Sequence, residues 1–516
     1  MLNKSNRYVE ATGDDIIDDI LERNKQFKAE KSAKPPKIRK WVWETSRKAY
    51  LGYIWGATIA WNKLPQWLCK PVTAVYNSRN NVIDMYYDQE EMETCSKMIV
   101  EKIMSDGSAL NRLMTECQIE HDKLVQVAAD LDSLKYGGLP EEVLYKVYEI
   151  FINQHTSVFR FSHTVRVAGK VGQERLEIYL EEKIADKKRA IEYMNILTAT
   201  PKDSFVATEG KELLELGVRV EKGEDLKALI SEHTREFCWT PIGYSDEQPY
   251  TEEYFLKEYN NLKSMPGSFE EKLQKLKEMN EKIRTERTNV LNELNPEPSI
   301  RNLADMLSEM TYMKDYVREA LSRSMYSSRK IFAEIGKRIG KKEGFVKIMT
   351  PDEINYALHG GLYDDWEIEN RVKHYILVFD LEKDDPLVYT GEKARVMELN
   401  FKFEKTEVNE VQGSVASLGH AIGKAKIILS QSDFAKFEQG DILIAPMTTP
   451  DFVPLMKKAA AIVTDEGGIT CHAAIVSREL GVPCIIGTQI ASKVFKDGEL
   501  IEVKANHGVV RRMEKQ

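Results

Sequence analysis

Most of the chain shows the hydrophobic spacing of long helices. From about residue 41 to residue 345, apolar side chains recur at every third or fourth position, and proline or glycine separates one such stretch from the next. This spacing places the apolar side chains on one face of a helix. The region is therefore predicted to be all-α. The longest stretches predicted to be helical are 90–104, 112–134, 141–155, 173–194, 268–294 and 303–339.

The pattern changes near residue 372 to short β-rich runs. Strands are expected at 375–380, 386–390 and 395–403, and a polar linker follows at 404–413. Beyond this linker, short apolar runs alternate with short helical patterns. The C-terminal part is therefore predicted to be a compact α/β domain, with a turn at 506–508 that joins its last two strands. The strands predicted in it are 424–429, 441–446, 461–464, 483–486, 500–503 and 509–511.

These patterns divide the chain into four segments. Residues 1–40 are predicted to form an acidic amphipathic helix (14–30) and a basic linker, and 41–371 form a helical domain that acts as a scaffold or as a substrate-binding domain. A short β-rich connector, 372–404, leads into the α/β domain at 405–516. The predicted fold class is a multidomain protein, in which a large, mostly α-helical N-terminal and central region is followed by a small α/β domain.

Composition and charge exclude a few classes of protein. The 516 residues carry a net charge of −9, which gives no support for a nucleic-acid partner. Six cysteines without a CxxC pair predict a reduced, cytoplasmic protein with no metal site. The N-terminus lacks the apolar core of a secretory signal. No membrane span is expected, because the most apolar stretch, 49–61, is shorter than the ~20 residues that a span needs.

One histidine lies where a short helix is predicted to begin. A buried strand is followed by Gly467 and Gly468, and helical spacing runs from Cys471 to Gly481. His472 therefore falls in the first turn, where unpaired amides and the helix dipole favour a bound dianion and disfavour a protonated ring. A neutral imidazole there can accept a phosphoryl group and pass it on. The alternative is a histidine that only caps the helix or fills the core.

A longer segment around this histidine resembles a known motif. GGITCHAAIVSR, residues 467–478, is similar to the phosphohistidine motif of the family that includes phosphoenolpyruvate synthase, pyruvate phosphate dikinase and rifampin phosphotransferase. Residues 440–465, 479–488 and 496–510 also resemble this family, so the likeness covers roughly 405–513. It implies that the α/β domain is a mobile, swivelling phosphohistidine domain. The agreeing positions are Gly467, Gly468, Thr470, His472, Ala473, Ala474 and Arg478.

The resemblance also implies roles for single residues. His472 would carry the phosphoryl group, and Thr470 would bind that group or the ring, although a simple helix cap explains Thr470 equally well. Arg478 would offset phosphate charge, or it forms a surface salt bridge. The phosphate loop would comprise Gly467, Gly468 and Cys471, the last of which can also be a small residue that fills the helix start.

The family's donor domains have no counterpart in the sequence. Residues 1–400 show no glycine-rich ATP-binding loop and read as helical, whereas an ATP-grasp domain needs sheets. No barrel for phosphoenolpyruvate is expected after residue 516. The order of segments resembles rifampin phosphotransferase or phenylphosphate synthase without the ATP-grasp domain. The expectation is therefore a phosphotransferase (kinase) subunit that works in a complex: ATP and Mg²⁺ bind to a separate ATP-grasp subunit, and this chain alone binds no cofactor.

The acceptor site, the docking surface for the partner subunit and the hinge are expected in the first 413 residues. A small-molecule hydroxyl acceptor would meet the histidine–arginine cluster within 155–166, although ordinary helix-surface residues would look the same. The tryptophan-rich segment 41–67 is predicted to dock the ATP-grasp subunit, although a buried aromatic helix beside a solvated linker would show the same composition. The linker 404–413, ending in Gly413, is predicted to be the hinge. The cluster consists of His155, Arg160, His163 and Arg166.

A function of a different class stays open. The chain could be a non-catalytic regulatory or binding protein that keeps the histidine domain as a docking module. The intact GGITCH loop (467–472) favours catalysis, whereas the absent ATP domain favours the regulatory reading. A neighbouring reading frame for an ATP-grasp protein would favour the split enzyme.

Overall fold

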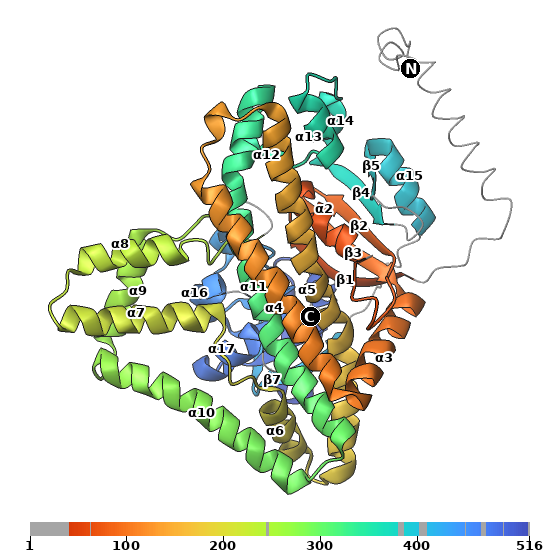
Figure 1. Cartoon of the computed structure of the whole chain (residues 1–516). Helices are drawn as coiled ribbons and strands as arrows, with labels where there is room; N and C mark the ends of the chain where they lie inside the picture. The colour runs from red at the N-terminus through yellow and green to blue at the C-terminus, as the bar shows by residue number, and fades with distance from the viewer. Residues whose placement is uncertain are drawn as a thin grey trace. The chain divides into compact units, whose positions relative to one another are not determined.

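A computed structural model describes most of the chain beyond residue 40 (Figure 1). The described residues are 41–61, 63–243, 247–379, 386–401, 410–448, 450–465, 471–488 and 490–513. Residues Trp41–Gln516 form one compact unit. The helix predicted at 14–30 and the basic linker after it lie outside the described residues.

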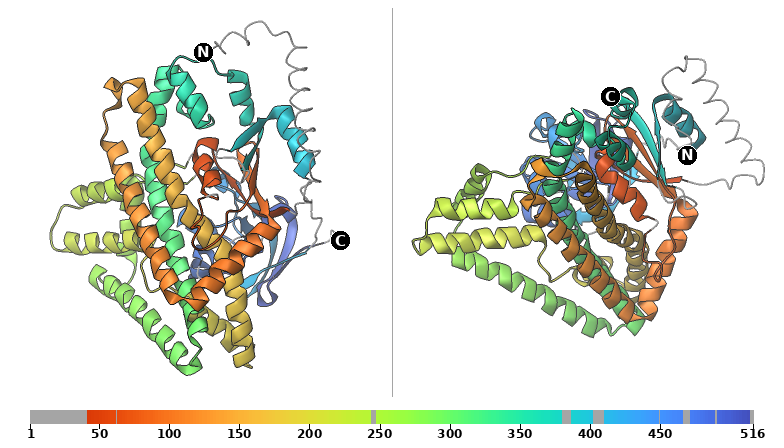
Figure 2. Two further views of the ribbon diagram at one scale, coloured as in Figure 1. Left: turned by 45° about the vertical axis from the view of Figure 1, so that its right-hand side comes forward. Right: turned by 45° about the horizontal axis from the view of Figure 1, so that its top comes forward.

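Helices build the larger part of the described chain, as the periodicity predicts. They are α2 (Leu51–Ala60), α3 (Gln89–Ser105), α4 (Gly107–Ser133), α5 (Glu141–Lys183), α6 (Lys187–Thr198), α7 (Phe205–Glu221), α8 (Leu226–Phe237), α9 (Glu252–Ser264), α10 (Phe269–Leu294), α11 (Pro298–Ile339), α12 (Glu343–Val346), α13 (Pro351–Leu358) and α14 (Asp365–Arg371). Helices α4, α5 and α11 pack side by side (Figures 1 and 2).

Close packing of α5 against α11 depends on a small residue. Gly172 of α5 lies against α11, and a Cβ atom there would meet Met306 Cε at 2.7 Å and Leu307 Cδ2 at 3.1 Å. α11 starts with Pro298 in its first turn and ends at Gly340, whose φ of 70° is left-handed. Proline and glycine thus set the two ends of this long helix, as their positions in the sequence predict.

A five-stranded antiparallel sheet joins two regions far apart in the sequence. The order is β1-β3-β2-β4-β5, so β2, from the region predicted to be helical, pairs with β4, from the predicted connector. The prediction of a separate β-rich connector is therefore wrong. The strands are β1 (Trp41–Lys48), β2 (Ala74–Arg79), β3 (Val82–Asp88), β4 (His374–Phe379) and β5 (Leu387–Thr390).

Local sequence explains both errors in this sheet. The strands β2 and β3 are joined by Asn80 and Asn81 with φ of 51° and 61°, a tight hairpin turn that lies within a long helical region. The predicted strand 395–403 is wrong, because residues Gly391–Phe401 form the helix α15. Its Ala394 is fully buried in a cluster with Val75 and Ile376 of the sheet, so the helix covers one face of the sheet instead of extending it.

The C-terminal α/β domain has the strands that the sequence predicts, with two more. Its eight-stranded sheet has the order β6-β13-β12-β8-β9-β10-β11-β7, in which β8, β9, β10 and β11 run parallel. The fold class is thereby confirmed. The elements are β6 (Glu410–Gln412), β7 (Ser414–Ser417), β8 (His420–Ile427), β9 (Ile442–Ala445), α16 (Val453–Met456), β10 (Ala461–Thr464), α17 (His472–Leu480), β11 (Cys484–Ile486), α18 (Ala491–Val494), β12 (Leu500–Lys504) and β13 (Val509–Arg512).

The end of the predicted hinge belongs to this domain. β6 pairs with β13, and Val411 is 3% exposed within the domain core. The amide of Gly413 donates to the carbonyl of Gly508 at 2.8 Å, and a Cβ atom on Gly413 would meet Ile486 O at 2.5 Å. The prediction that Gly413 ends a hinge is therefore wrong. The hinge stays a prediction for 404–409, which lie outside the described residues.

The docking surface predicted at 41–67 is wrong for the tryptophan side chains that the structure describes. Trp55 and Trp61 are 7% and 0% exposed, and the half-buried Trp67 donates from Nε1 to Glu116 at 3.2 Å. α2 is apolar all round, so it packs into the core between its neighbours rather than at the surface.

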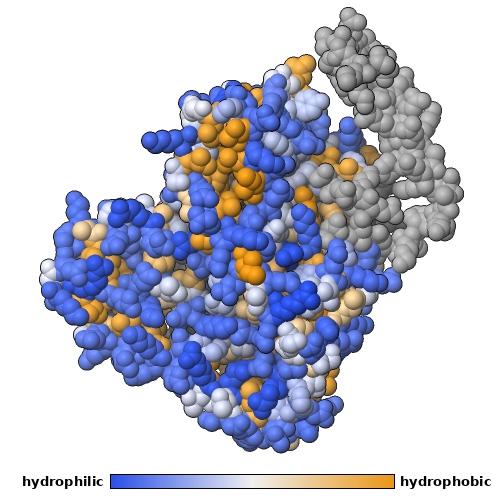
Figure 3. All heavy atoms as spheres, in the orientation of Figure 1, coloured by the Kyte–Doolittle hydropathy of each residue, from blue (hydrophilic) through white to orange (hydrophobic). Residues whose placement is uncertain are grey.

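Exposed apolar side chains gather elsewhere. Tyr356, Leu362 and Trp366, around α13 and α14, are more exposed than the other large apolar side chains of the described residues. The face shown in Figure 3 is mainly hydrophilic with scattered apolar patches. The described surface thus offers apolar side chains near α13 and α14 rather than along α2.

Within the described residues, none of the helices combines the length and the apolar character needed to cross a bilayer.

Candidate functional site

The carboxyl ends of two parallel strands meet at one edge of the C-terminal sheet. In the β9–β10 pair, Ala445 lies opposite Thr464. The chain leaving β9 reaches Thr448 three residues later, and the chain leaving β10 passes Asp465 on its way to His472. Because parallel strands end at the same edge, the two connections lie together there.

Asp465 fixes the start of the second connection. Its carboxylate is 2% exposed and accepts hydrogen bonds from Thr488 Oγ1 and from the amide of Ser492, each at 3.1 Å. The amide of Asp465 donates to the carbonyl of Ala445 at 3.1 Å. With two hydrogen bonds to its buried carboxylate and one from its amide, Asp465 holds the chain firmly where it leaves the sheet.

The predicted phosphate loop itself cannot be compared with the structure. Gly467, Gly468 and Thr470 lie outside the described residues, whereas Cys471 lies within them. The roles expected of the two glycines and of the threonine stay predictions.

The helix predicted after this loop is present and begins at the histidine. Cys471 is the N-cap residue of α17 and makes no side-chain cap hydrogen bond, and Gly481 ends the helix with a φ of 65°. Ala473 and Ala474 are 1% and 0% exposed. Their small side chains let the helix lie close to the sheet. The N-terminus of the helix, and His472 with it, lies at the edge of the sheet.

Thr448 is the hydrogen-bond partner of the histidine. Its Oγ1 lies 2.8 Å from His472 Nδ1. When Nδ1 carries the proton and donates to Thr448, the lone pair lies on Nε2, which makes Nε2 the nucleophilic atom. Sequence patterns did not single out Thr448, although its position just after the strand predicted at 441–446 is a usable signal.

Burial keeps the ring of His472 neutral. Desolvation lowers the pKa of this histidine to about 4, because a charged imidazolium loses part of its solvation at this half-buried position. The helix N-terminus disfavours the same charge. At neutral pH the ring is therefore an uncharged base with a lone pair available for a phosphoryl group.

Two further predicted residues flank the histidine. Arg478 is exposed and donates from Nε to the carbonyl of Ala474 at 3.0 Å, within its own helix. Burial raises the pKa of the Cys471 thiol, so it stays protonated and acts as a small, half-buried residue at the helix start. The charge-offsetting role expected of Arg478 stays a prediction.

The two histidines predicted near the acceptor are core residues. His155 is 0% exposed, with Nδ1 at 3.2 Å from Ser324 Oγ, and burial lowers its pKa to about 3. His163 is also 0% exposed, contacts the carbonyl of Ala57 at 2.8 Å and stacks on Trp61 at 3.9 Å between ring centroids. Both rings therefore pack in the core, whereas the sequence left open only an acceptor pocket or the helix surface.

The two arginines of the same cluster are half-buried on α5. The guanidinium of Arg160 lies over the ring of Phe161 at 4.7 Å from its centroid. Arg166 lies six residues further along the helix. The acceptor-binding role expected of Arg160 and Arg166 stays a prediction.

Across the part of the chain that the structure describes, no group of three or more His, Cys, Asp or Glu side chains is placed to hold a metal ion. The expectation that ATP and Mg²⁺ bind to a partner subunit stays a prediction.

Comparisons with known proteins agree with the C-terminal geometry. Residues 437–508 match the family described as PEP-utilising enzyme, mobile domain. A probable phosphoenolpyruvate synthase of Archaeoglobus fulgidus is 43% identical over 34% of this chain and 22% of that protein. The phosphoenolpyruvate synthase of Aeropyrum pernix is 54% identical over 19% of this chain and 12% of that protein.

Another relative matches a larger share of the chain. The uncharacterized phosphotransferase YvkC of Bacillus subtilis is 27% identical over 59% of this chain and 39% of that protein. This chain thus covers well under two thirds of the length of each of these relatives. A solved structure, holo aconitase X of Thermococcus kodakaraensis, shares 20% identity over 20% of this chain and 98% of that chain, with a TM-score of 0.17, too low to inform the fold.

Proposed function

We propose that this chain, whose C-terminal domain is a mobile domain of the PEP-utilising enzymes, carries a phosphoryl group on His472. Its relatives are phosphoenolpyruvate synthases and a phosphotransferase, which supports phosphoryl transfer as the type of chemistry. One observation identifies the reacting atom. His472 is neutral, begins a helix and is hydrogen-bonded through Nδ1 to Thr448, which leaves Nε2 to act as the nucleophile.

The proposed cycle has three steps. An ATP-grasp subunit uses ATP and water to form AMP and phosphate, and leaves one phosphoryl group on Nε2. The mobile domain then moves to a second site. There the oxygen of a hydroxyl acceptor attacks phosphorus, and the P–Nε2 bond breaks with its electron pair returning to the ring. The protein contributes positioning and charge neutralisation, which dominate catalysis of phosphoryl transfer.

Chemical phosphorylation of the purified chain tests this proposal without the partner subunit. Phosphoramidate, which releases ammonia as it transfers its phosphoryl group to imidazole, is expected to label His472 ahead of the other eight histidines of the nine in the chain. Intact mass should rise by one phosphoryl group that is lost in acid and kept in alkali. Even labelling of the exposed histidines without labelling of His472 would contradict the carrier role. It would favour the alternative, a non-catalytic regulatory protein.

Loading from ATP is tested separately. Co-expression with an ATP-grasp protein encoded beside this chain, followed by addition of ATP, should yield the same acid-labile label and release AMP. The chain by itself should give neither the acid-labile label nor AMP. ATP cleavage by the chain alone would contradict the assignment of ATP binding to a partner.

The rate of labelling should depend on pH in a way that reports the burial of His472. Because the pKa is lowered to about 4, the ring is neutral above that value and becomes protonated as the pH falls through it. The initial rate of labelling, corrected for the protonation of phosphoramidate itself, should therefore stay constant from pH 8 to about pH 5 and fall below that. A midpoint near the ordinary histidine pKa of about 6.5 would mean that the ring is solvated.

A further inference from the structure

The C-terminal domain has apolar cores of its own. Its buried apolar side chains, from Val411 to Val510, form two clusters. The clusters of the helical part and of the five-stranded sheet lie wholly before the domain. Among the described residues, therefore, no cluster of buried apolar side chains contains members from both sides of the junction. Domains that share no apolar core are expected to move relative to each other.

Lys493 of α18 makes a polar contact across this junction. Its Nζ forms an ion pair with Asp84 Oδ1 of β3 at 3.1 Å and donates to Tyr86 Oη at 3.3 Å. The ammonium also lies 4.9 Å from the centre of the Tyr86 ring. A carboxylate beside an aromatic ring attracts a cation through both its charge and the quadrupole of the ring. Asp84 and Tyr86 together thus form a receptor for the Lys493 ammonium.

This receptor belongs to one face of the five-stranded sheet. Asp84 and Tyr86 are two positions apart on β3, so their side chains lie on the same side of the strand. Tyr86 is 8% exposed and packs in a cluster with Ala394 of α15. The face that receives Lys493 is therefore also the face that α15 covers. In sequence, α15 leads to the predicted hinge at 404–409.

Lys493 is firmly joined to its own domain. Its neighbours Ala491 and Val494 on α18 are 0% and 5% exposed in one of the domain's apolar cores. The amide of Ser492 donates to the buried carboxylate of Asp465 at 3.1 Å. A shift of the domain relative to the sheet would therefore carry Lys493 with it.

Water reaches both members of the ion pair. The side chains of Lys493 and Asp84 are 29% and 31% exposed. When they separate, water can solvate both charges, whereas separation of a fully buried pair would leave a charge without compensation. The contact is thus specific in its geometry and can still open.

We propose, resting on the carrier function of His472, that Lys493 and its receptor on the sheet, Asp84 and Tyr86, form a releasable docking contact for the mobile domain. The contact holds the domain in one resting position. When the contact opens, the domain turns on the predicted hinge at 404–409 and carries His472 to a second site.

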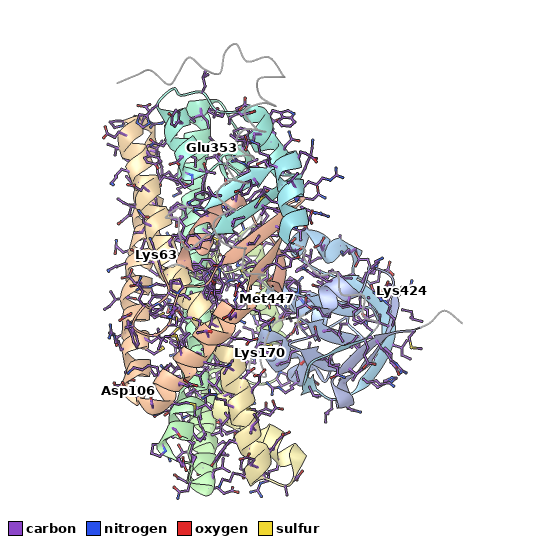
Figure 4. All side chains as sticks on the ribbon, turned by 90° about the vertical axis from the view of Figure 1, so that its right-hand side faces the viewer. Lys63, Asp106, Lys170, Glu353, Lys424 and Met447 are labelled. Atoms are coloured by element: carbon purple, nitrogen blue, oxygen red, sulfur yellow. The ribbon has the colours of Figure 1, made fainter. Side chains whose placement is uncertain are left out.

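A distance measurement between two spin labels tests whether this contact sets the position of the domain. The labels are attached at two exposed positions marked in Figure 4, through Lys63→Cys in the helical part and Lys424→Cys in the domain. The full-length chain also carries Cys471→Ser, because the other five cysteines are buried. With the contact intact, one main distance is expected. Asp84→Lys places two ammonium groups together and should raise the population of other distances roughly tenfold or more.

Two further variants separate the docking contact from a general effect on the fold. Lys493→Glu, added to Asp84→Lys, restores opposite charges and should restore the single main distance. Lys436→Gln is the matched control, because Lys436 pairs with Asp497 at 2.7 Å within the domain, with comparable exposure. It should leave the distance unchanged. Thermal unfolding shows that each variant is folded.

Carbodiimide coupling tests the contact in the unmodified chain. The reagent activates a carboxylate, which an amine in direct contact then attacks to form an amide with the net loss of one water molecule. Peptide mass should show a bond between Asp84 and Lys493. The pair Lys436 and Asp497 should couple as well and serves as the reference.

These outcomes distinguish the two proposals. Several distances with the contact intact, or an unchanged single distance in Asp84→Lys, would overturn the docking contact. Absence of the 84–493 bond in a folded chain that forms the reference bond would do the same. Failure of the wild type to load from phosphoramidate would overturn the carrier function, whereas neither the distances nor the coupling depends on loading.

Discussion

A His472→Gln chain is expected to take up no acid-labile phosphoryl group, either from phosphoramidate or from ATP with an ATP-grasp subunit. Glutamine keeps a polar group near Thr448 but has no basic nitrogen, so no P–N bond can form. The fold should survive, because the change removes one hydrogen bond worth about 1 kcal/mol and leaves the buried alanines of α17 in place. Intact mass and thermal unfolding measure the two effects.

His420→Gln is the matched control for this experiment. His420 lies on β8, half-exposed, with Nε2 at 2.9 Å from Glu502, in the same domain but away from the edge where β9 and β10 end. It should be labelled as the wild type is. Labelling of the His472→Gln chain at the wild-type level would place the carrier on another residue.

Thr448→Val is expected to slow labelling of His472 roughly 10- to 100-fold, which corresponds to the about 1–3 kcal/mol cost of leaving a buried N–H without a partner. Thr448 is 6% exposed, so water cannot readily replace its hydroxyl. Without that oxygen, the tautomer with the proton on Nδ1 and the lone pair on Nε2 loses its stabilisation. Initial rates of mass gain at pH 7 measure the effect.

Thr448→Ser separates this cause from a change in packing. Serine keeps the hydroxyl and removes one methyl group, so its labelling rate should stay close to that of the wild type. If Ser and Val variants were slowed equally, the methyl group and not the hydrogen bond would position the ring. If neither were slowed, Thr448 would have no part in choosing the tautomer.

Much of the C-terminal site could be read from the sequence because its determinants are local. The strand at 461–464, the start of α17 at His472 and its end at Gly481 follow from an apolar run, a change of periodicity and a left-handed glycine. The long helices, such as α11, follow from the same kind of signal, with Pro298 and Gly340 at their limits.

Other features depend on contacts between residues far apart, which periodicity does not report. The pairing of β2 with β4 joins residues about three hundred positions apart, and neither strand signals its partner. The same holds for the histidines of α5: their spacing fits a surface or a core equally, and only packing against α2 and α11 buries His155 and His163.

The sequence by itself thus determined the helical and α/β parts and the single histidine at a helix start, because backbone preferences and the spacing of apolar side chains act over a few residues. The tertiary structure decided which oxygen holds that histidine and which predicted histidines are buried. These choices depend on desolvation and on distances between separate elements, and both arise only when the elements pack together.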